Sequence, residues 1–279
     1  MKRQVVETII GAPTMDGAGV HLIRVLGPNE VQRFDPFLML DAFDSHNPDE
    51  YVKGFPFHPH RGIETVTYLM KGHIDHEDSL GNKGTIRDGQ SQWMTAGSGI
   101  IHQEMPKPSE HLLGLQLWIN LPQNEKMIEP SYFDITAEMI KKVDEPFGSV
   151  RVISGEYKGN KSIEPPHVQA TLMDVEIKPD HSFLLPTDKE ANLFVYVVNG
   201  SGHFGGDENR LTRNKLAVRF DMKDEFYVRA GKGGIRFVLF AARPLKEPIS
   251  WGGPIVMNSN EELENAFKEL RLGTFIKHK

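Results

Sequence analysis

Two copies of one short β-rich pattern occur in this sequence, and the repeat limits the fold more than any other feature. The segment ETVTYLMKG at 64–72 aligns with NLFVYVVNG at 192–200, and AGSGIIH at 96–102 aligns with AGKGGIR at 230–236. The two offsets differ by a few residues, as an insertion in one copy requires. The repeat therefore predicts two β-barrels or sandwiches in tandem, each of about 130 residues.

The remaining sequence agrees with an all-β fold. Short runs that alternate or are rich in β-branched residues are separated by Gly, Pro, Asn and Asp, which favour turns. These predicted strands are 19–26, 64–70, 114–121, 170–177, 192–199 and 235–242. We place the boundary between the two copies near residue 134, which gives an N-terminal domain 1–134 and a C-terminal domain 135–279.

Two segments are predicted to be helical: TAEMIKKV at 136–143 and SNEELENAFKELRLG at 259–273. In the second segment, Ser259 and Glu262 occupy capping-box positions, and Gly273 is a typical helix stop. Apolar residues recur in this segment at three- and four-residue spacing, so we expect the helix to dock on a sheet.

Composition and charge exclude several classes of function. The net charge of −6 and the lack of a Lys/Arg cluster argue against direct binding to nucleic acid or to an anionic membrane. The sequence has no run of about 18 apolar residues that could form a membrane helix, and its N-terminus lacks the apolar core of a signal peptide. A chain without disulfides fits the cytosol, so we expect a cytoplasmic protein. Because the chain contains no cysteine, a transition metal would need nitrogen and oxygen ligands.

Four candidate ligands lie in two short motifs. In FPFHPHRGIE (55–64), His58 and His60 are two residues apart in a predicted strand, so their side chains share one face. An HxH pair alone is common on solvated strands. In WMTAGSGIIHQEMP (93–106), His102 and Glu104 repeat the spacing after a glycine-rich turn. If both strands lie on one barrel wall, the four side chains converge on a site that suits Fe(II), Mn(II), Co(II), Ni(II), Cu(II) or Zn(II).

The residues around these motifs resemble a known family. The stretch 57–106, with FHPHRGIETVTYLMKG and GSGIIHQEMP, is similar to the signature region of the pirin family in the cupin superfamily, and RPLKEPISWGGPIVMNSNEEL (243–263) resembles the pirin C-terminal segment. The resemblance implies two tandem jelly-roll cupin barrels. It also implies one mononuclear metal, usually iron, in the N-terminal cupin domain, and a C-terminal cupin domain without metal ligands. The implied ligands are His58, His60, His102 and Glu104.

The resemblance also implies an activity: quercetin 2,3-dioxygenase, which opens a flavonol ring oxidatively with loss of carbon monoxide. The substrates would be a small aromatic molecule and dioxygen, and Glu104 would take the proton of the flavonol 3-hydroxyl. An alternative is a non-enzymatic, iron-dependent co-regulator that senses redox state and binds a protein partner. A third reading is a cupin enzyme acting on another enediol or aromatic diol.

Two points about the ligand set stay open in the sequence. The general cupin pattern would use Glu64 as the carboxylate ligand, but the Arg-Gly pair before it can disturb the strand, so we favour Glu104. In the second copy, one alignment puts Pro186 and Asp188 at the first histidine pair and Arg236 and Val238 at the second motif. Another alignment deletes the second ligand strand. With either alignment, the second copy lacks the ligands.

Other residues have a functional and a structural interpretation. His73 and His76 lie in a polar, turn-like segment and are expected to be solvated, with His76 the nearer neighbour of the metal. Trp93, Met94, Trp118 and Phe57 could wall a pocket for an aromatic ligand or belong to an ordinary barrel core.

Overall fold

The computed structural model describes residues 1–278 of the chain, which form two compact units. Neither unit is continuous in sequence. The early unit comprises residues 12–136 and the segment from residue 245 on, and the late unit comprises residues 1–11 and 137–244. The predicted domains, 1–134 and 135–279, concern which parts fold independently, and that stays a prediction.

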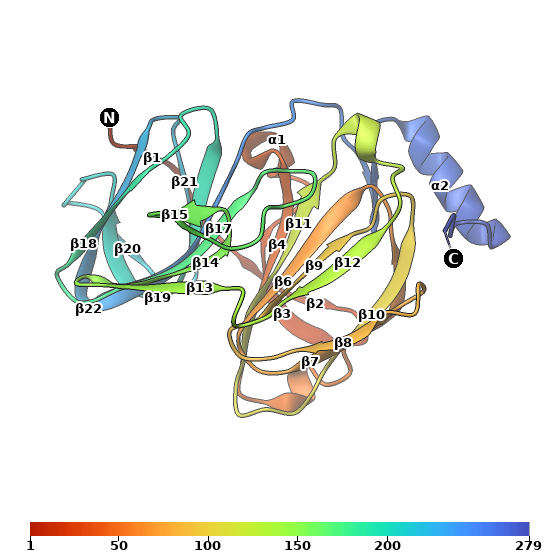
Figure 1. Ribbon diagram of the computed structural model, residues 1–279, viewed down its shortest axis with the longest axis horizontal. Helices are drawn as coiled ribbons and strands as arrows, with labels where there is room; N and C mark the ends of the chain where they lie inside the picture. Colours follow the sequence, from red (N-terminus) through yellow and green to blue (C-terminus); the bar gives the residue numbers. More distant parts are fainter. Residues whose placement is uncertain (279) are drawn as a thin grey trace. The chain divides into compact units, whose positions relative to one another are not determined.

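The early unit contains two large antiparallel sheets (Figure 1). The seven-stranded sheet has the order β12 (Ser131–Ile135), β9 (Ser91–Thr95), β6 (Ile63–Lys71), β11 (Leu112–Asn120), β4 (Phe37–Ser45), β3 (Val20–Leu26) and β2 (Ala12–Asp16). The four-stranded sheet has the order β5 (Phe55–His60), β10 (Ile100–Pro106), β7 (Ile74–Asp78) and β8 (Lys83–Ile86). A small third sheet pairs β23 (Ser250–Gly252) with β24 (Ile255–Met257).

The late unit is built around one nine-stranded sheet. Its main path is β1 (Val5–Ile10), β21 (Leu216–Phe220), β19 (Asn192–Phe204), β22 (Glu225–Ala242), β17 (Thr171–Ile177), β14 (Gly148–Ser154) and β13 (Lys141–Glu145). Off this path, β18 (Ser182–Pro186) pairs with β22, and β20 (Leu211–Arg213) pairs with β19. A separate short hairpin pairs β15 (Glu156–Tyr157) with β16 (Asn160–Lys161).

The two sheet orders match strand for strand, which confirms the predicted repeat. In the early unit β6 lies between β9 and β11, and in the late unit β19 lies between β21 and the second half of β22. Likewise, β5 pairs with β10 as β18 pairs with the first half of β22. The all-β prediction of two related copies is therefore right.

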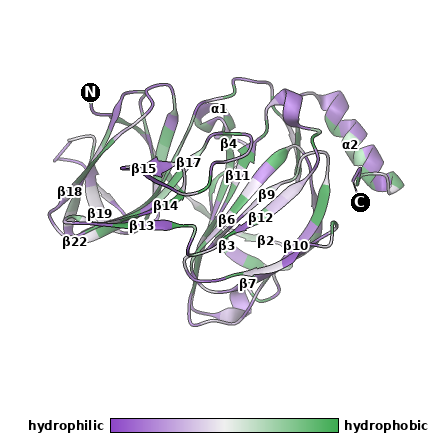
Figure 2. Cartoon of the chain, viewed as in Figure 1, coloured by the Kyte–Doolittle hydropathy of each residue, from purple (hydrophilic) through white to green (hydrophobic). Residues whose placement is uncertain are grey.

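The interior of the late unit is filled with aromatic side chains. Phe204, Phe220, Phe226 and Phe237 are buried, and neighbouring rings in this group have centroids 5.2–6.1 Å apart. Such edge-on and tilted contacts are favourable for aromatic rings in a core. Figure 2 shows hydrophobic residues concentrated on the strands. The interior of the late unit is thus packed with aromatic side chains, whereas the early unit contains a cavity, described below.

The predicted C-terminal helix is confirmed as α2 (Asn260–Leu272). The Ser259 side chain accepts from the Glu262 backbone N–H, the Glu262 side chain accepts from the Ser259 backbone, and Gly273 ends the helix at φ 70°. The helix buries Ala266 and packs partly buried apolar side chains against β23 and β24. The other short helices are α1 (Val31–Phe34) and 3₁₀ turns at Pro48–Glu50 and Gln123–Glu125. No helix within residues 1–278 is long and apolar enough to cross a membrane.

The helix predicted over 136–143 is wrong. Residues 137–139 form a turn, and the rest of the segment enters β13, whose Lys141 pairs with Val152 of β14. The segment is too short for a stable helix unless it packs an apolar face, and the free edge of β14 offers backbone hydrogen bonds instead.

Candidate metal centre

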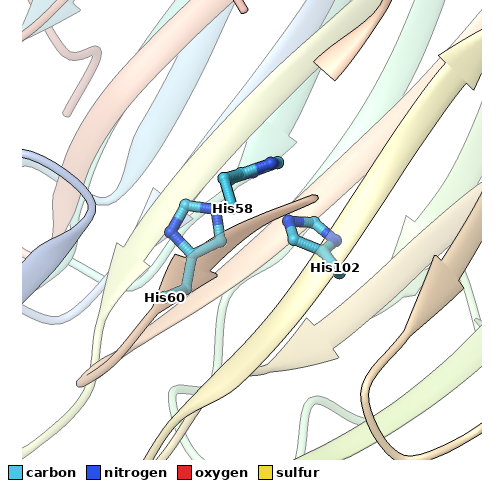
Figure 3. A group of neighbouring side chains, drawn as sticks. All are labelled: His58, His60 and His102. Carbon is cyan, nitrogen blue, oxygen red and sulfur yellow. The ribbon is translucent and has the colours of Figure 1, made fainter. Parts of the chain in front are cut away.

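Strands β5 and β10 bring three histidines together. The strands pair antiparallel with His102 opposite His58, and His60 lies two residues after His58 on the same face. The nitrogen donors of the three rings all lie within 4.8 Å of one another. Figure 3 shows the rings gathered where the two strands run side by side, with His58 and His60 from β5 and His102 from β10. The ring centroids are 4.4–5.0 Å apart.

Backbone carbonyls fix two of the rings with Nε2 available to a metal. Nδ1 of His60 donates to the Pro254 carbonyl at 3.1 Å, and Nδ1 of His58 donates to the Pro56 carbonyl at 2.9 Å. A carbonyl oxygen only accepts, so each Nδ1 carries the proton and each Nε2 keeps a lone pair. Metal-binding histidines in proteins are commonly oriented in this way.

His102 provides the strongest sign of a bound cation. Its Nε2 is buried and has no hydrogen-bond partner within the described chain. Buried polar atoms are nearly always paired, so an orphaned imidazole nitrogen beside two other imidazoles fits a metal ligand. The residues present therefore fit a transition metal held by nitrogen donors.

The electrostatics of the cluster also favour metal binding. Burial, together with the nearby His58, lowers the pKa of His60 to about 3, although the hydrogen bond to the Pro254 carbonyl acts in the opposite direction. Burial likewise holds the pKa of His102 well below its usual value, with His60 and His58 adding to the effect. Metal ligation requires neutral imidazole, so these two rings need lose no proton to bind a cation near neutral pH.

Glu104 lies on the same strand as His102 and is buried. A register irregularity separates the two residues, and Glu104 lines the same cavity as His58 and His60. Thr67 Oγ1 donates to Glu104 Oε1 at 2.9 Å, and Thr67 also contacts Gln116 Oε1 at 2.6 Å. Burial raises the pKa of the Glu104 carboxyl, although His58 and Thr67 act in the opposite direction. The metal-sized cluster contains only the histidines, so Glu104 as a ligand stays a prediction.

The alternative carboxylate, Glu64, has a different environment. The strand is interrupted between His60 and Ile63, where Gly62 adopts φ 77°. Glu64 Oε1 accepts from Trp93 Nε1 at 3.0 Å and from Thr95 Oγ1 at 2.9 Å. Glu64 is not among the residues that line the cavity. It belongs to the packing between β6 and β9.

A cavity of about 610 Å³ opens on the histidine cluster. This volume lies within the range of small-molecule sites in proteins. His58, His60 and Glu104 contribute to its wall together with Trp118 and Trp251. The Trp118 ring meets His60 edge-on at 4.9 Å and lies 5.9 Å from Trp251. The cavity thus combines a metal-ligating wall with flat aromatic surfaces.

The other candidate residues lie in the cavity wall, in the core or at the surface. Of the proposed aromatic wall residues, Trp118 lines the cavity, Trp93 and Met94 are fully buried in the core, and Phe57 is exposed. His73 is partly exposed and contacts Asp75 at 3.0 Å.

The expectation that His76 is solvated is wrong. It is a buried residue of β7, lies opposite Glu104 in the sheet register, and contacts the Tyr132 hydroxyl and Asp134. Tyr132 gave no signal in the sequence.

The late unit retains the ligand strands without the ligands. The inward-facing residues of β18 are Phe183 and Leu185, which lie opposite Val228 and Phe226 of β22 and belong to the apolar core of the late unit. Both sequence alignments of this region were wrong: the strand is not deleted, and Arg236 lies in the second half of β22, where it binds Asp174 at 2.7 Å. The conclusion that the second copy lacks the ligands still holds. Among residues 1–278, the histidine trio is the one cluster of three or more donors that could hold an ion.

Several residues of the site could not be found by sequence reasoning. Arg24 and Asp41 line the cavity from β3 and β4, and Trp251 and Pro254 reach it from the C-terminal segment. These four positions share no spacing or motif, because they meet only through strand pairing and the return of the chain after residue 245.

Comparison with known proteins shows close relatives over the full length. The family models described as "Pirin" and "Pirin C-terminal cupin domain" match residues 19–119 and 172–276. The chain is 42% identical over 280 residues to a Pseudomonas aeruginosa protein named "Putative quercetin 2,3-dioxygenase", with 97% of each chain covered.

Solved structures agree. A crystal structure of quercetin 2,3-dioxygenase from Acinetobacter baumannii matches with a TM-score of 0.90 at 30% identity, covering 99% of both chains. The bacterial pirin YhhW from Escherichia coli, solved in complex with nickel(II), matches with a TM-score of 0.66 at 22% identity, covering 85% of this chain and 99% of that one. At that identity, the likeness to YhhW shows the fold alone.

Proposed function

This chain belongs to the pirin family, with its bicupin fold and C-terminal helix, and we propose that it is a metal-dependent dioxygenase acting on flavonols such as quercetin. The observation that best supports the proposal is the trio of histidines, two of which, His58 and His60, line a cavity with aromatic walls. The proposed reaction joins one flavonol and one dioxygen, opens the central ring, and releases one carbon monoxide and a depside.

The proposed ligands are His58, His60, His102 and Glu104. Three imidazoles and a carboxylate without thiolate suit Fe(II), Ni(II), Co(II), Mn(II), Cu(II) or Zn(II). Among these metals, we propose Fe(II) because of the resemblance to pirins. A metal held there would supply Lewis acidity toward the 3-hydroxyl and 4-carbonyl oxygens of a flavonol and redox chemistry toward dioxygen.

Glu104 is the proposed base for the flavonol 3-hydroxyl. Its Oε1 accepts the Thr67 hydroxyl, which orients the carboxylate and leaves Oε2 for a proton or a cation. Because burial raises the pKa of Glu104, the carboxylate is a stronger base than a solvated one.

The aromatic wall is proposed to position the substrate. A flavonol is flat, and the rings of Trp118, Trp251, Phe43 and Phe55 line the cavity beside the metal ligands. Stacking and edge contacts with these rings would hold the flavonol plane and remove water from around Glu104.

The proposal is tested by stripping the protein with a chelator and reloading it anaerobically with Fe(II), Ni(II), Co(II), Mn(II), Cu(II) or Zn(II) in separate samples. We expect quercetin and dioxygen to be consumed in equal amounts with release of carbon monoxide by at least one reloaded form, and by none of the stripped samples. If every reloaded form binds its metal but none consumes dioxygen with quercetin, the enzymatic proposal is wrong. The co-regulator role, with its protein partner, would then be the prediction to pursue.

A further inference from the structure

The cavity contains a second polar group that the proposed chemistry does not use. Arg24 of β3, Asp41 of β4 and Asp16 at the end of β2 all line it, and we call these three residues the Arg24 cluster. Arg24 donates to both oxygens of Asp41, from Nε at 2.9 Å and from Nη2 at 2.7 Å, and Nη2 also donates to Asp16 Oδ2 at 2.7 Å.

The cluster is an anchored site with excess negative charge. Two carboxylates share one guanidinium, so the group carries a net charge of −1 when all three are ionised. The Asp41 side chain is 4% exposed and holds Arg24 through two hydrogen bonds, whereas the Asp16 side chain is 50% exposed. Although burial alone would raise the pKa of Asp16, Arg24 and the Gly17 N–H together lower it, so Asp16 stays ionised near neutral pH.

This charge arrangement decides which ligand groups fit. Arg24 is already bound by two carboxylates, so a ligand carboxylate would gain little from it and would be repelled by Asp16 and Asp41. Carboxylate oxygens have lone pairs for more than one hydrogen bond, and bonds to a charged acceptor are the strong ones. The cluster therefore favours neutral groups that donate hydrogen bonds, such as phenolic hydroxyls.

The surrounding wall favours an aromatic carrier for those hydroxyls. Phe43 and Phe55 line the same cavity as the Arg24 cluster, and their rings lie 6.2 Å apart in an edge-on arrangement. A flat ligand between aromatic side chains can turn its edge, where ring hydroxyls project, toward Asp16 and Asp41.

We propose that Arg24, Asp41 and Asp16 form the subsite for the hydroxyl groups on the flavonol ring that lies away from the metal. The cavity then selects polyhydroxylated flavonols over flavonols whose rings are bare or carry a carboxylate. This inference rests on the proposed function, because it takes the ligand to be a flavonol held at the metal through its 3-hydroxyl.

The experiment measures ligand binding by the metal-loaded full chain through quenching of tryptophan fluorescence, since Trp118 and Trp251 line the cavity. The probes are quercetin, 3-hydroxyflavone and a carboxyl-substituted 3-hydroxyflavone. Compared with quercetin, 3-hydroxyflavone keeps the 3-hydroxyl but lacks every other hydroxyl. For the wild type we expect the lowest Kd for quercetin and the highest for the carboxylated probe.

The variant Asp16→Asn separates the subsite from the rest of the cavity. It keeps the size of the side chain and an acceptor for Arg24 but removes the charge. We expect the Kd for quercetin to rise about 10-fold, that for 3-hydroxyflavone to stay within about 2-fold, and that for the carboxylated probe to fall. The matched control is Asp88→Asn, because Asp88 is 54% exposed, pairs with Lys71 and accepts from a glycine N–H but lies outside the cavity.

A second variant, Asp41→Asn, should shift the three probes in the same directions, and if it fails to fold, Asp16→Asn alone decides. Equal losses for quercetin and 3-hydroxyflavone, an unchanged Kd for quercetin, or a wild type that binds neither would each overturn the subsite. Oxygen uptake is scored separately: ring-selective binding without uptake removes the enzymatic proposal and leaves the subsite.

Discussion

The carbonyl of Pro254 accepts a hydrogen bond from Nδ1 of His60 at 3.1 Å, although the two residues are 194 positions apart in the chain. The C-terminal segment of the early unit thus orients a ring whose strand begins at residue 55. The same segment provides Phe275 O for Arg61, the residue that follows His60. The candidate metal centre is therefore completed by a part of the chain that lies far from the histidine motifs in sequence.

Replacing His102 with leucine should show separately how the unpaired Nε2 affects the stability of the apoprotein and whether it binds metal. Without metal, the buried Nε2 has no partner among the described residues, and such a group costs about 1–3 kcal/mol, so the His102→Leu apoprotein should be as stable as the wild type or more stable. With Ni²⁺ added, the wild type should gain thermal stability and the variant should not. Thermal unfolding with and without Ni²⁺ measures both effects.

His203→Leu is the matched control, because Nδ1 of His203 is also buried without a partner in the described part of the chain but lies outside the histidine trio. This variant should keep the full response to Ni²⁺. A His102→Leu protein that is still stabilised by Ni²⁺ would show that the trio is not the metal site.

Glu104→Gln should remove catalysis while keeping the contact with Thr67. The amide oxygen can still accept from Thr67 Oγ1, but it cannot take a proton from a flavonol. A positioned base contributes about 10²–10⁴ in rate, so dioxygen consumption should fall at least about 100-fold. Metal content, measured on the same samples, shows whether the loss also reflects weaker metal binding.

Glu64→Gln tests the other carboxylate. Because Glu64 is held by Trp93 and Thr95 away from the cavity, this variant should keep its metal and most of its dioxygen consumption while losing stability. The reverse pattern, with Glu64→Gln inactive and Glu104→Gln active, would assign the role to Glu64.

Much of the fold was predictable because it depends on local signals. The predictions of the periodic strands, the repeat and the capping box of α2 are confirmed, because alternation and capping depend on residues only a few positions apart. The helix expected at 136–143 failed because the edge of β14 decides that conformation, and an edge is not visible in local sequence.

The site was predictable in part for the same reason. The spacing of His58 and His60 fixes their common face, and the pairing of β5 with β10 then brings in His102. The far wall of the cavity depends instead on contacts between distant segments. Arg24 meets Asp41 across neighbouring strands, and Pro254 arrives from the C-terminal segment, so neither has a local pattern.

Arg61 should be essential to the stability of the early unit and hard to replace with lysine. Its side chain is 3% exposed; Nε donates to Ser98 O, Nη2 donates to Phe275 O, and Nη1 pairs with Glu269 at 2.8 Å. Lysine cannot reproduce a planar fork with three partners, so Arg61→Lys should lower the free energy of unfolding by about 3 kcal/mol. Chemical denaturation gives this value, and hydrogen exchange should show faster opening of α2.

The exposed Arg87→Lys is the control for this substitution and should change the free energy of unfolding by no more than about 0.5 kcal/mol. An Arg61→Lys protein with wild-type stability and unchanged exchange in α2 would contradict the role given to Arg61.

Lys126 should make the stability of the early unit depend on pH. Lys126 is 2% exposed, and its ammonium donates to Gly62 O, Asn120 Oδ1 and Val256 O at 2.6–3.0 Å. Burial lowers the pKa of Lys126 to about 7, although Glu247 and Glu262 oppose the shift. The unfolded chain keeps an ordinary lysine, with a pKa of about 10.4. Between these two values the unfolded state binds one more proton than the folded state, so this group makes stability rise with pH.

Lys126→Met removes the titrating group and the donor together. The free energy of unfolding of the wild type minus that of this variant should therefore increase by a few kcal/mol from pH 6.5 to pH 9.5. Below pH 7 the wild type bears the full cost of a buried charge, whereas at pH 9.5 its neutral amine still donates to two of the three acceptors that methionine leaves unpaired. Urea unfolding of metal-free protein at several pH values measures this difference. Lys83→Met, at a lysine that is 68% exposed, should show no such trend. If the unfolding free energy of the wild type minus that of Lys126→Met stays constant or decreases as the pH rises, Lys126 remains charged in the folded state, and its three acceptors outweigh the effect of burial.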